Sequence, residues 1–156
     1  MFRTIVVPVD GSEPSNSAVS FALRMAAESG AQVTFAHAVE TAKIVAMTSA
    51  SSVAPQYALE AAMDAGKEIL AEALSQAQQA KVVATTELIE GDCVSSLLEL
   101  ADRAHADLIV VGSHGRSGLS RVLLGSVAEG ILRRARVPVL VTHAAKKPES
   151  VTLVGV

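Results

Sequence analysis

The sequence lacks several residue types on which whole classes of protein depend. It has a single cysteine, Cys93, which excludes an internal disulfide and a zinc site built from cysteines. It has no tryptophan and only 3% aromatic residues, so the base-stacking platforms of single-strand nucleic-acid binders are missing. Thirteen basic residues against 16 acidic ones give a net charge of −3, which does not suit a protein that coats DNA or RNA.

Long hydrophobic runs are missing as well. The apolar start of the chain ends at Asp10, too soon for a signal peptide. No stretch approaches the ~20 apolar residues of a membrane-spanning helix. Hydrophobic residues still make up 50% of the chain, with alanine and valine spread along it, as a sheet buried on both faces requires. We therefore expect one cytoplasmic domain that binds neither nucleic acid nor membranes.

Short β-branched runs alternate with stretches of helical periodicity. Two runs, 5–7 and 108–111, are continuously apolar, which is typical of interior strands of a parallel sheet. Apolar residues spaced i, i+3, i+4 and i+7 from Val19 predict a helix, capped by Ser12 or Ser15. The alternation predicts an α/β fold with a parallel sheet and helices on both faces. The expected strands are residues 4–9, 32–39, 81–89, 107–113 and 137–142.

The same signals predict the later helices and the connections. A long amphipathic helix spans 57–80, another follows an N-cap at Asp92, and a last one begins near Ser126. The segment 41–56 is rich in alanine, serine and threonine and is expected to be a mobile connection. Ligands of such folds bind at the carboxyl ends of the strands, where the strand order reverses. The loops after the first and fourth strands are therefore the places to search.

The stretch from Gly112 to Ser126 is rich in glycine, follows the fourth expected strand and opens a helix. Glycines let the backbone approach a ligand closely, and consecutive N–H groups at the start of a helix favour an anion. Arg116 adds positive charge, and Ser126 either caps the helix or bonds a phosphate oxygen. The loop therefore predicts a phosphate cradle, with an ordinary strand–helix connection as the alternative. Neither the Walker pattern nor the G-x-G-x-x-G dinucleotide pattern is present.

The spacing of this loop matches a family pattern. Gly112 is followed after two residues by Gly115 and after nine more by Gly125, next to Ser126. This spacing resembles the ATP-binding signature of the universal stress protein family. The likeness also covers three longer stretches of the chain, namely residues 5–12, 107–115 and 137–141.

The resemblance spans essentially residues 1–143 and leaves 144–156 as a C-terminal tail. It implies a doubly wound, five-stranded parallel sheet of the adenine nucleotide alpha hydrolase-like type. It also implies a homodimer that pairs through the last strand, 137–142. The cofactor it implies is ATP or a related adenine nucleotide (ADP or AMP), accompanied by Mg²⁺ that the phosphates largely hold.

The resemblance also implies a set of nucleotide contacts, of which Asp10 has an independent rationale. A carboxylate at the end of the first strand can accept hydrogen bonds from ribose hydroxyls. Alternatively, Asp10 builds the turn before the first helix. The expected nucleotide-binding residues are Pro8, Val9, Asp10, Ala38, Val111, Gly112, Gly115, Arg116, Gly125, Ser126 and Val127.

The remaining reactive side chains carry weaker signals. The four histidines lack metal-ligand spacing, so no metal site is expected. His37 lies on an expected strand and is predicted to be packed. His114, in the glycine loop, belongs either near a ligand or to the structure of the loop itself. Cys93 starts a helix, where a thiol pKa can be lowered, but no partner residue is visible, and an inert cysteine is expected.

The function follows from what the loop contains and what it does not. No general base can be assigned for a water that attacks the terminal phosphate, so no catalytic residue is predicted. We expect a stress-response module that binds an adenine nucleotide and signals through dimer or partner contacts. Two alternatives stay open: a slow ATPase or nucleotidyl-transfer enzyme on the same fold, and a nucleotide-free dimer that binds a protein partner.

Overall fold

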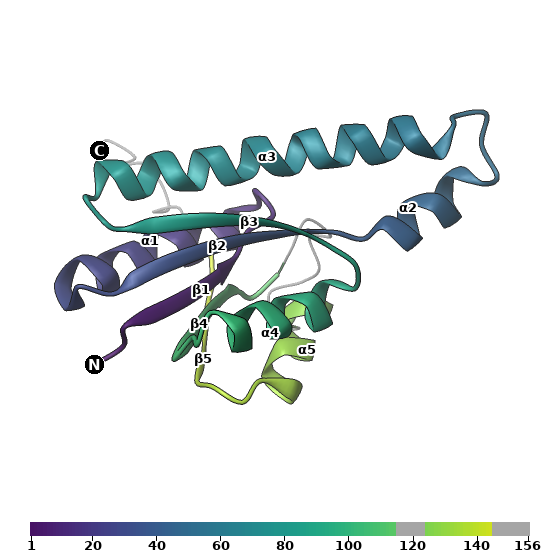
Figure 1. The fold of residues 1–156 in the computed structure, drawn as a ribbon. Helices are drawn as coiled ribbons and strands as arrows, with labels where there is room; N and C mark the ends of the chain where they lie inside the picture. Colours follow the sequence, from purple (N-terminus) through teal and green to yellow (C-terminus); the bar gives the residue numbers. More distant parts are fainter. Residues whose placement is uncertain (115–123, 145–156) are drawn as a thin grey trace, which may run out of the picture.

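The sheet lies between two layers of helices (Figure 1) in the computed structural model, which describes residues 1–114 and 124–144. All strand pairs are parallel, and the order is β3-β2-β1-β4-β5. The predicted α/β fold with a five-stranded parallel sheet is therefore confirmed. The first strand is central, and the order reverses between β1 and β4. The strands are β1 (Thr4–Pro8), β2 (Gln32–Val39), β3 (Ala84–Glu90), β4 (Leu108–Gly112) and β5 (Val139–Thr142).

Helices cover both faces because successive side chains of a buried strand point to opposite sides of the sheet. Ile5 and Val7 of β1 belong to the core beneath α1 and α3, whereas Val6 belongs to the core beneath α4 and α5. All three side chains are fully buried. This explains why the sequence of β1 is continuously apolar. The helices are α1 (Glu13–Ser29), α2 (Thr41–Thr48), α3 (Pro55–Gln79), α4 (Cys93–Arg103) and α5 (Ser126–Arg134).

Helices α1 and α4 have the capping residues that the sequence suggested. Of the two serines offered for α1, Ser12 is the N-cap, and its Oγ accepts a hydrogen bond from the Ser15 amide at 3.3 Å. Gly30 ends α1 in the left-handed conformation, at φ 74°, where a side chain would be strained. Asp92 caps α4 as predicted, because its carboxylate accepts from the Ser95 amide at 2.9 Å.

The prediction of a mobile connection over 41–56 is wrong for its first half. Residues 41–48 form the helix α2, which no sequence signal had indicated. Glu40 and Lys43 form an ion pair of 2.7 Å across its first turn, and the Thr48 hydroxyl donates to the Ile44 carbonyl at 2.9 Å. None of the α2 residues is buried, and its apolar residues 44–47 are consecutive, so they spread around the helix and form no apolar stripe.

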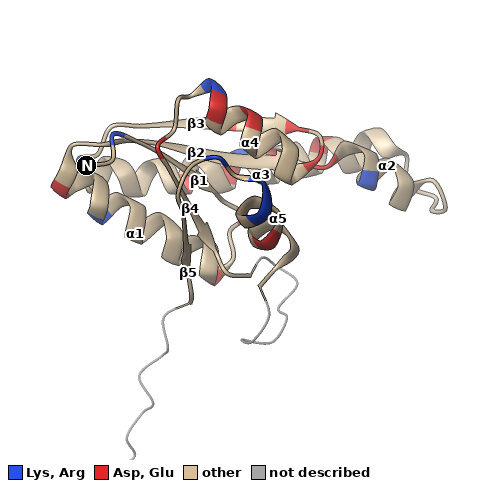
Figure 2. Cartoon of the chain, turned by 90° about the horizontal axis from the view of Figure 1, so that it is seen from below, with Lys and Arg blue, Asp and Glu red and all other residues tan. Residues whose placement is uncertain are grey.

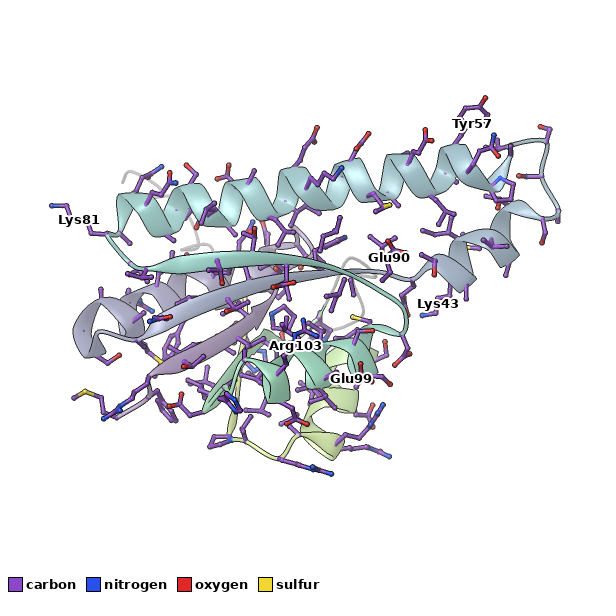
Figure 3. The ribbon with its side chains drawn as sticks, viewed as in Figure 1. Lys43, Tyr57, Lys81, Glu90, Glu99 and Arg103 are labelled. Carbon is purple, nitrogen blue, oxygen red and sulfur yellow. The ribbon has the colours of Figure 1, made fainter. Side chains whose placement is uncertain are left out.

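Helix α2 and the first turns of α3 extend past the carboxyl end of the sheet (Figure 1). The only charged residue of α2 is Lys43, and charges of both signs are scattered over the rest of the described chain (Figure 2). Tyr57, near the start of α3, points away from the sheet (Figure 3) and is 63% exposed. Helix α2 and the start of α3 thus lie beside the edge of the sheet that is formed by the carboxyl ends of the strands.

Two strands, β3 and β5, begin two or three residues later than predicted. Lys81 follows α3 with φ 56°, and the connection continues to residue 83, so β3 starts at Ala84 and not at 81. Pro138 precedes β5, which lies at the edge of the sheet as its proline suggested. The Pro138 carbonyl still accepts from the Ile109 amide at 3.0 Å. Within the part of the chain that is described, no helix is long and apolar enough to cross a membrane.

Candidate functional site

A cavity of about 230 Å³ lies where the strand order reverses, at the carboxyl ends of β1 and β4. This is the position at which open α/β sheets bind ligands. Of the expected binding residues, Gly115 and Arg116 lie outside the described residues. All the others line this one cavity: Pro8, Val9, Asp10, Ala38, Val111, Gly112, Gly125, Ser126 and Val127.

Further lining residues were not predicted from the sequence as part of the site. Ala36 and His37 stand beside Ala38 at the end of β2, so the topology of the sheet could have indicated them. Ser15 and Cys93 lie in the first turns of α1 and α4, which start at the same edge of the sheet. The additional set is Ser15, Ala36, His37, Cys93, Leu97 and Ala128, and His114, for which a place near a ligand was one of two open alternatives, lines the cavity as well.

Asp10 builds the turn before α1, one of the two roles that the sequence left open, and it also lies at the cavity wall. Its Oδ1 accepts from the Ser12 amide at 2.9 Å, which forms the turn before α1. Its own amide donates to the Ser15 hydroxyl at 3.1 Å. Asp10 also lines the cavity. The turn therefore fixes the carboxylate at the cavity wall, where an acidic side chain can accept hydrogen bonds from a ligand hydroxyl.

Gly112 is required by packing against α1. A Cβ at this position would lie 2.6 Å from the Pro14 carbonyl carbon and 2.8 Å from the Ser15 amide nitrogen. The Pro14 carbonyl oxygen also accepts a hydrogen bond from the Thr142 hydroxyl at 3.3 Å. This bond holds the start of α1 over β4 and β5. The glycine thus lets the N-terminus of α1 approach β4 closely enough to close one side of the cavity.

The N-terminus of α5 forms another wall. Gly125 is the N-cap, its amide donates to the Ser113 carbonyl at 2.7 Å, and its carbonyl accepts from the Glu129 amide at 2.9 Å. Ser126 is therefore the first residue of the helix and not its cap, and no side chain in the described residues caps α5. The first N–H groups of a helix have no partner within it and carry partial positive charge. Ser126 and Val127 both line the cavity, so this wall favours an anion.

His37 is packed, as predicted, and also lines the cavity. Its Nδ1 donates to the Val9 carbonyl at 2.7 Å and so ties the ends of β1 and β2 together. On the other side, a Cβ at Gly66 of α3 would lie 2.6 Å from the His37 Cδ2. The ring therefore has little freedom, and it holds the backbone of Val9 in place at the cavity wall.

Cys93, which the sequence predicted to be inert, has surroundings that disfavour its thiolate form. Its pKa is raised from 9.0 to about 11, mainly by burial and in smaller part by the carboxylates of Glu40 and Asp92. The thiol is therefore protonated at neutral pH and contributes a small apolar surface to the cavity. The cavity as a whole joins apolar side chains and backbone to a few polar groups, which suits a ligand with both an apolar ring and an anionic group.

Comparison with known proteins gives the same family over nearly the whole chain. The sequence profile of the universal stress protein family matches residues 1–143. Universal stress protein MJ0531 of Methanocaldococcus jannaschii is 35% identical over 147 residues, which cover 94% of this chain and 85% of that protein. Universal stress protein Rv1636 of Mycobacterium tuberculosis is 36% identical over 156 residues, covering 91% of this chain and 97% of that protein.

Solved structures of similar proteins share the fold. A universal stress protein family member from Burkholderia pseudomallei has a TM-score of 0.73 and 29% identity, covering 91% of this chain and 96% of that one. A universal stress protein in complex with cAMP has a TM-score of 0.64 and 34% identity, covering 92% of this chain and 98% of that one. The chain belongs to the universal stress protein family.

Proposed function

We propose that the chain binds ATP, or the related nucleotides ADP or AMP, in the cavity between the ends of β1 and β4. In this proposal the protein is a cytoplasmic stress-response module that senses the nucleotide and does not turn it over. The observation that carries the proposal is that residues far apart in the sequence, from Pro8 to Val127, line a single cavity with a glycine-capped helix N-terminus. The similar protein of 34% identity that was solved with cAMP supports an adenine nucleotide as the ligand class.

The chemistry of the walls suggests how the nucleotide lies. Pro8, Val9 and Ala38 offer apolar and backbone surface to the adenine ring. Asp10 accepts hydrogen bonds from the ribose hydroxyls. The phosphates lie at the first turn of α5, near Ser126, where free N–H groups and the helix dipole favour negative charge. Mg²⁺, when it accompanies the nucleotide, takes most of its ligands from the phosphates and water.

Isothermal titration with ATP, AMP and cAMP tests the proposal. A phenylalanine at Ala38 fills the cavity, whereas the same change at Ala71, an exposed alanine of α3, adds equal bulk away from it. We expect saturable binding by the wild type and by A71F, and at least a tenfold weaker affinity for A38F. The proposal is wrong if the wild type binds no adenine nucleotide at millimolar concentration, or if A38F binds as well as A71F does.

Turnover distinguishes a binding module from an enzyme. We expect less than one phosphate released per chain during hours of incubation with ATP and Mg²⁺. Repeated turnover that falls in an Asp10→Ala variant would instead make the protein an ATPase.

The proposed module is a homodimer that pairs through the last strand, 137–142. The edge position of β5 supports this, since an edge strand leaves one row of backbone groups without a strand partner. Pro138 and Thr142 direct their carbonyls to β4, so the alternating pattern directs those of Val139 and Val141 outward. Light scattering after gel filtration should give twice the 16.1 kDa chain mass, and Val141→Pro should give a folded monomer. A monomeric wild type would exclude the dimer.

A further inference from the structure

His114 carries a buried polar atom that has no partner. In the described part of the chain its Nε2 is the one buried side-chain nitrogen or oxygen without a hydrogen bond. Buried polar groups are nearly always paired, so an unpaired one in a cavity wall calls for an explanation such as a ligand. His114 lines the proposed nucleotide cavity. We propose that the His114 Nε2–H group donates a hydrogen bond to a phosphate oxygen of the bound nucleotide, an inference that rests on the proposed function.

The neighbouring serine determines which ring nitrogen of His114 carries the proton. The Ser113 Oγ and the His114 Nδ1 are 3.0 Å apart, and either atom can be the donor. Ser113 is only 1% exposed, and among the described residues its hydroxyl has no other partner. If Nδ1 were the donor, the buried hydroxyl proton would be left without an acceptor, which is costly. The hydroxyl therefore donates to Nδ1, which leaves Nε2 as the ring nitrogen that carries a proton.

A donor at Nε2 selects the chemical class of its partner. It requires an acceptor, and a phosphate oxygen is a strong, charged one. The backbone directly before His114 is held by two hydrogen bonds, because the Ser113 amide donates to the Thr142 carbonyl and the Ser113 carbonyl accepts from the Gly125 amide, each at 2.7 Å. The second of these bonds joins Ser113, the residue before His114, to the N-terminus of α5. The ring and the helix start therefore line one cavity and favour the same anionic group.

Paired titrations with adenosine and AMP test this role, because the two ligands differ only in the phosphate. A hydrogen bond to a charged group corresponds to roughly a tenfold to hundredfold change in affinity. We expect H114A and H114N to bind AMP at least tenfold more weakly than the wild type and adenosine equally well. H114Q, whose amide nitrogen reaches the position of Nε2, should restore AMP affinity to within about threefold of the wild type, since it keeps the donor.

Each other outcome overturns a defined part of the account. Equal AMP affinity in the wild type, H114A and H114N contradicts the role of His114 and leaves the proposed function intact. Equal losses for adenosine and AMP mean that His114 only supports the loop. A wild type that binds neither ligand contradicts the proposed function itself.

A measurement on the wild type is independent of how the variants fold. Long-range ¹H–¹⁵N spectra of the histidine rings report which nitrogen carries the proton. We expect the Nε2–H form for His114 in the ligand-free protein, and the Nδ1–H form would overturn the inference.

Discussion

Replacing Gly112 with alanine places one methyl group against the backbone of α1. The nearest atoms are the Pro14 carbonyl carbon at 2.6 Å, the Pro14 oxygen at 2.7 Å and the Ser15 nitrogen at 2.8 Å. Contacts this short cannot persist, so either α1 or the end of β4 must move. The Pro14 oxygen also accepts a hydrogen bond from the Thr142 hydroxyl, and the Ser15 hydroxyl accepts one from the Asp10 amide. The movement therefore breaks hydrogen bonds at the cavity wall as well as packing.

The expected cost follows from overpacking. Forcing an extra methyl group into a closely packed site costs about 1–3 kcal/mol of unfolding free energy. For a chain of this size each kcal/mol lowers the melting temperature by about 2–4 °C. If the substitution lowers the free energy of unfolding by about 2 kcal/mol, G112A should melt about 4–8 °C below the wild type. Its ATP affinity should fall too, because Asp10 and Ser15 line the same cavity.

Gly130 of α5 provides the matched control. A Cβ there would lie 2.8 Å from the Cγ2 of Val94, which is a side-chain atom. G130A should therefore be destabilised as well, and the second change Val94→Ala should recover part of the loss. For G112A no side-chain truncation relieves the contact, because all three near atoms are backbone. Thermal and urea unfolding of the variants test this, and a G112A protein that melts within about 1 °C of the wild type would refute the packing argument.

Four further predictions concern Cys93, which lines the cavity, and the helix caps Ser12 and Asp92. Cys93, with its pKa raised to about 11 mainly by burial, should have about a hundredfold smaller thiolate fraction at pH 8 than an ordinary thiol, so iodoacetamide should alkylate it more slowly, and saturating ATP should slow the reaction further. Because its pKa is higher in the folded state than the usual 9.0, stability should fall as pH rises from 9 toward 11, and C93A should lack this fall in denaturant titrations. Ser12→Ala removes the N-cap of α1 and should cost about 1 kcal/mol in urea unfolding, whereas Ser12→Asp should keep most of it. The Asp92 pKa is lowered from 3.8 by the hydrogen bond from the Ser95 amide, so the melting difference between the wild type and D92A should narrow as pH falls below 3.8. Alkylation of Cys93 at the rate of a free thiol would contradict the first prediction, and a C93A protein with the same loss of stability above pH 9 would contradict the second. An unchanged free energy of unfolding in S12A would contradict the third. A melting difference between the wild type and D92A that stays constant with pH would contradict the fourth.

The sequence predicted the sheet well because its strands carry strong local signals. Ile5–Val7 and Leu108–Val111 are continuously apolar, and both prove to be buried central strands. The proline before β5 indicated its edge position, and the alternation of strands and helices indicated the parallel topology. Helix α2 was missed because its apolar residues 44–47 are consecutive and show no helical period.

The site was predictable where a motif marks it and not where folding alone brings residues together. The glycine spacing pointed to Gly112, Gly125 and Ser126, which do meet at one cavity. The reason for Gly112 was not visible, because its contact with Pro14 joins positions far apart in the chain. His37 was expected only to pack, since nothing local shows that the end of β2 faces the cavity. The unpaired nitrogen of His114 likewise emerges only from the packing around it.

The melting temperature of the wild type and A38F in ATP tests nucleotide binding at the cavity most directly. At ATP about 100 times the dissociation constant measured for the wild type, binding adds about 2.7 kcal/mol. For a chain of this size the wild type should melt about 5–11 °C higher with ATP than without it, and A38F should show much less of this rise. An unchanged wild-type melting temperature, or an equal rise in A38F, would contradict the account.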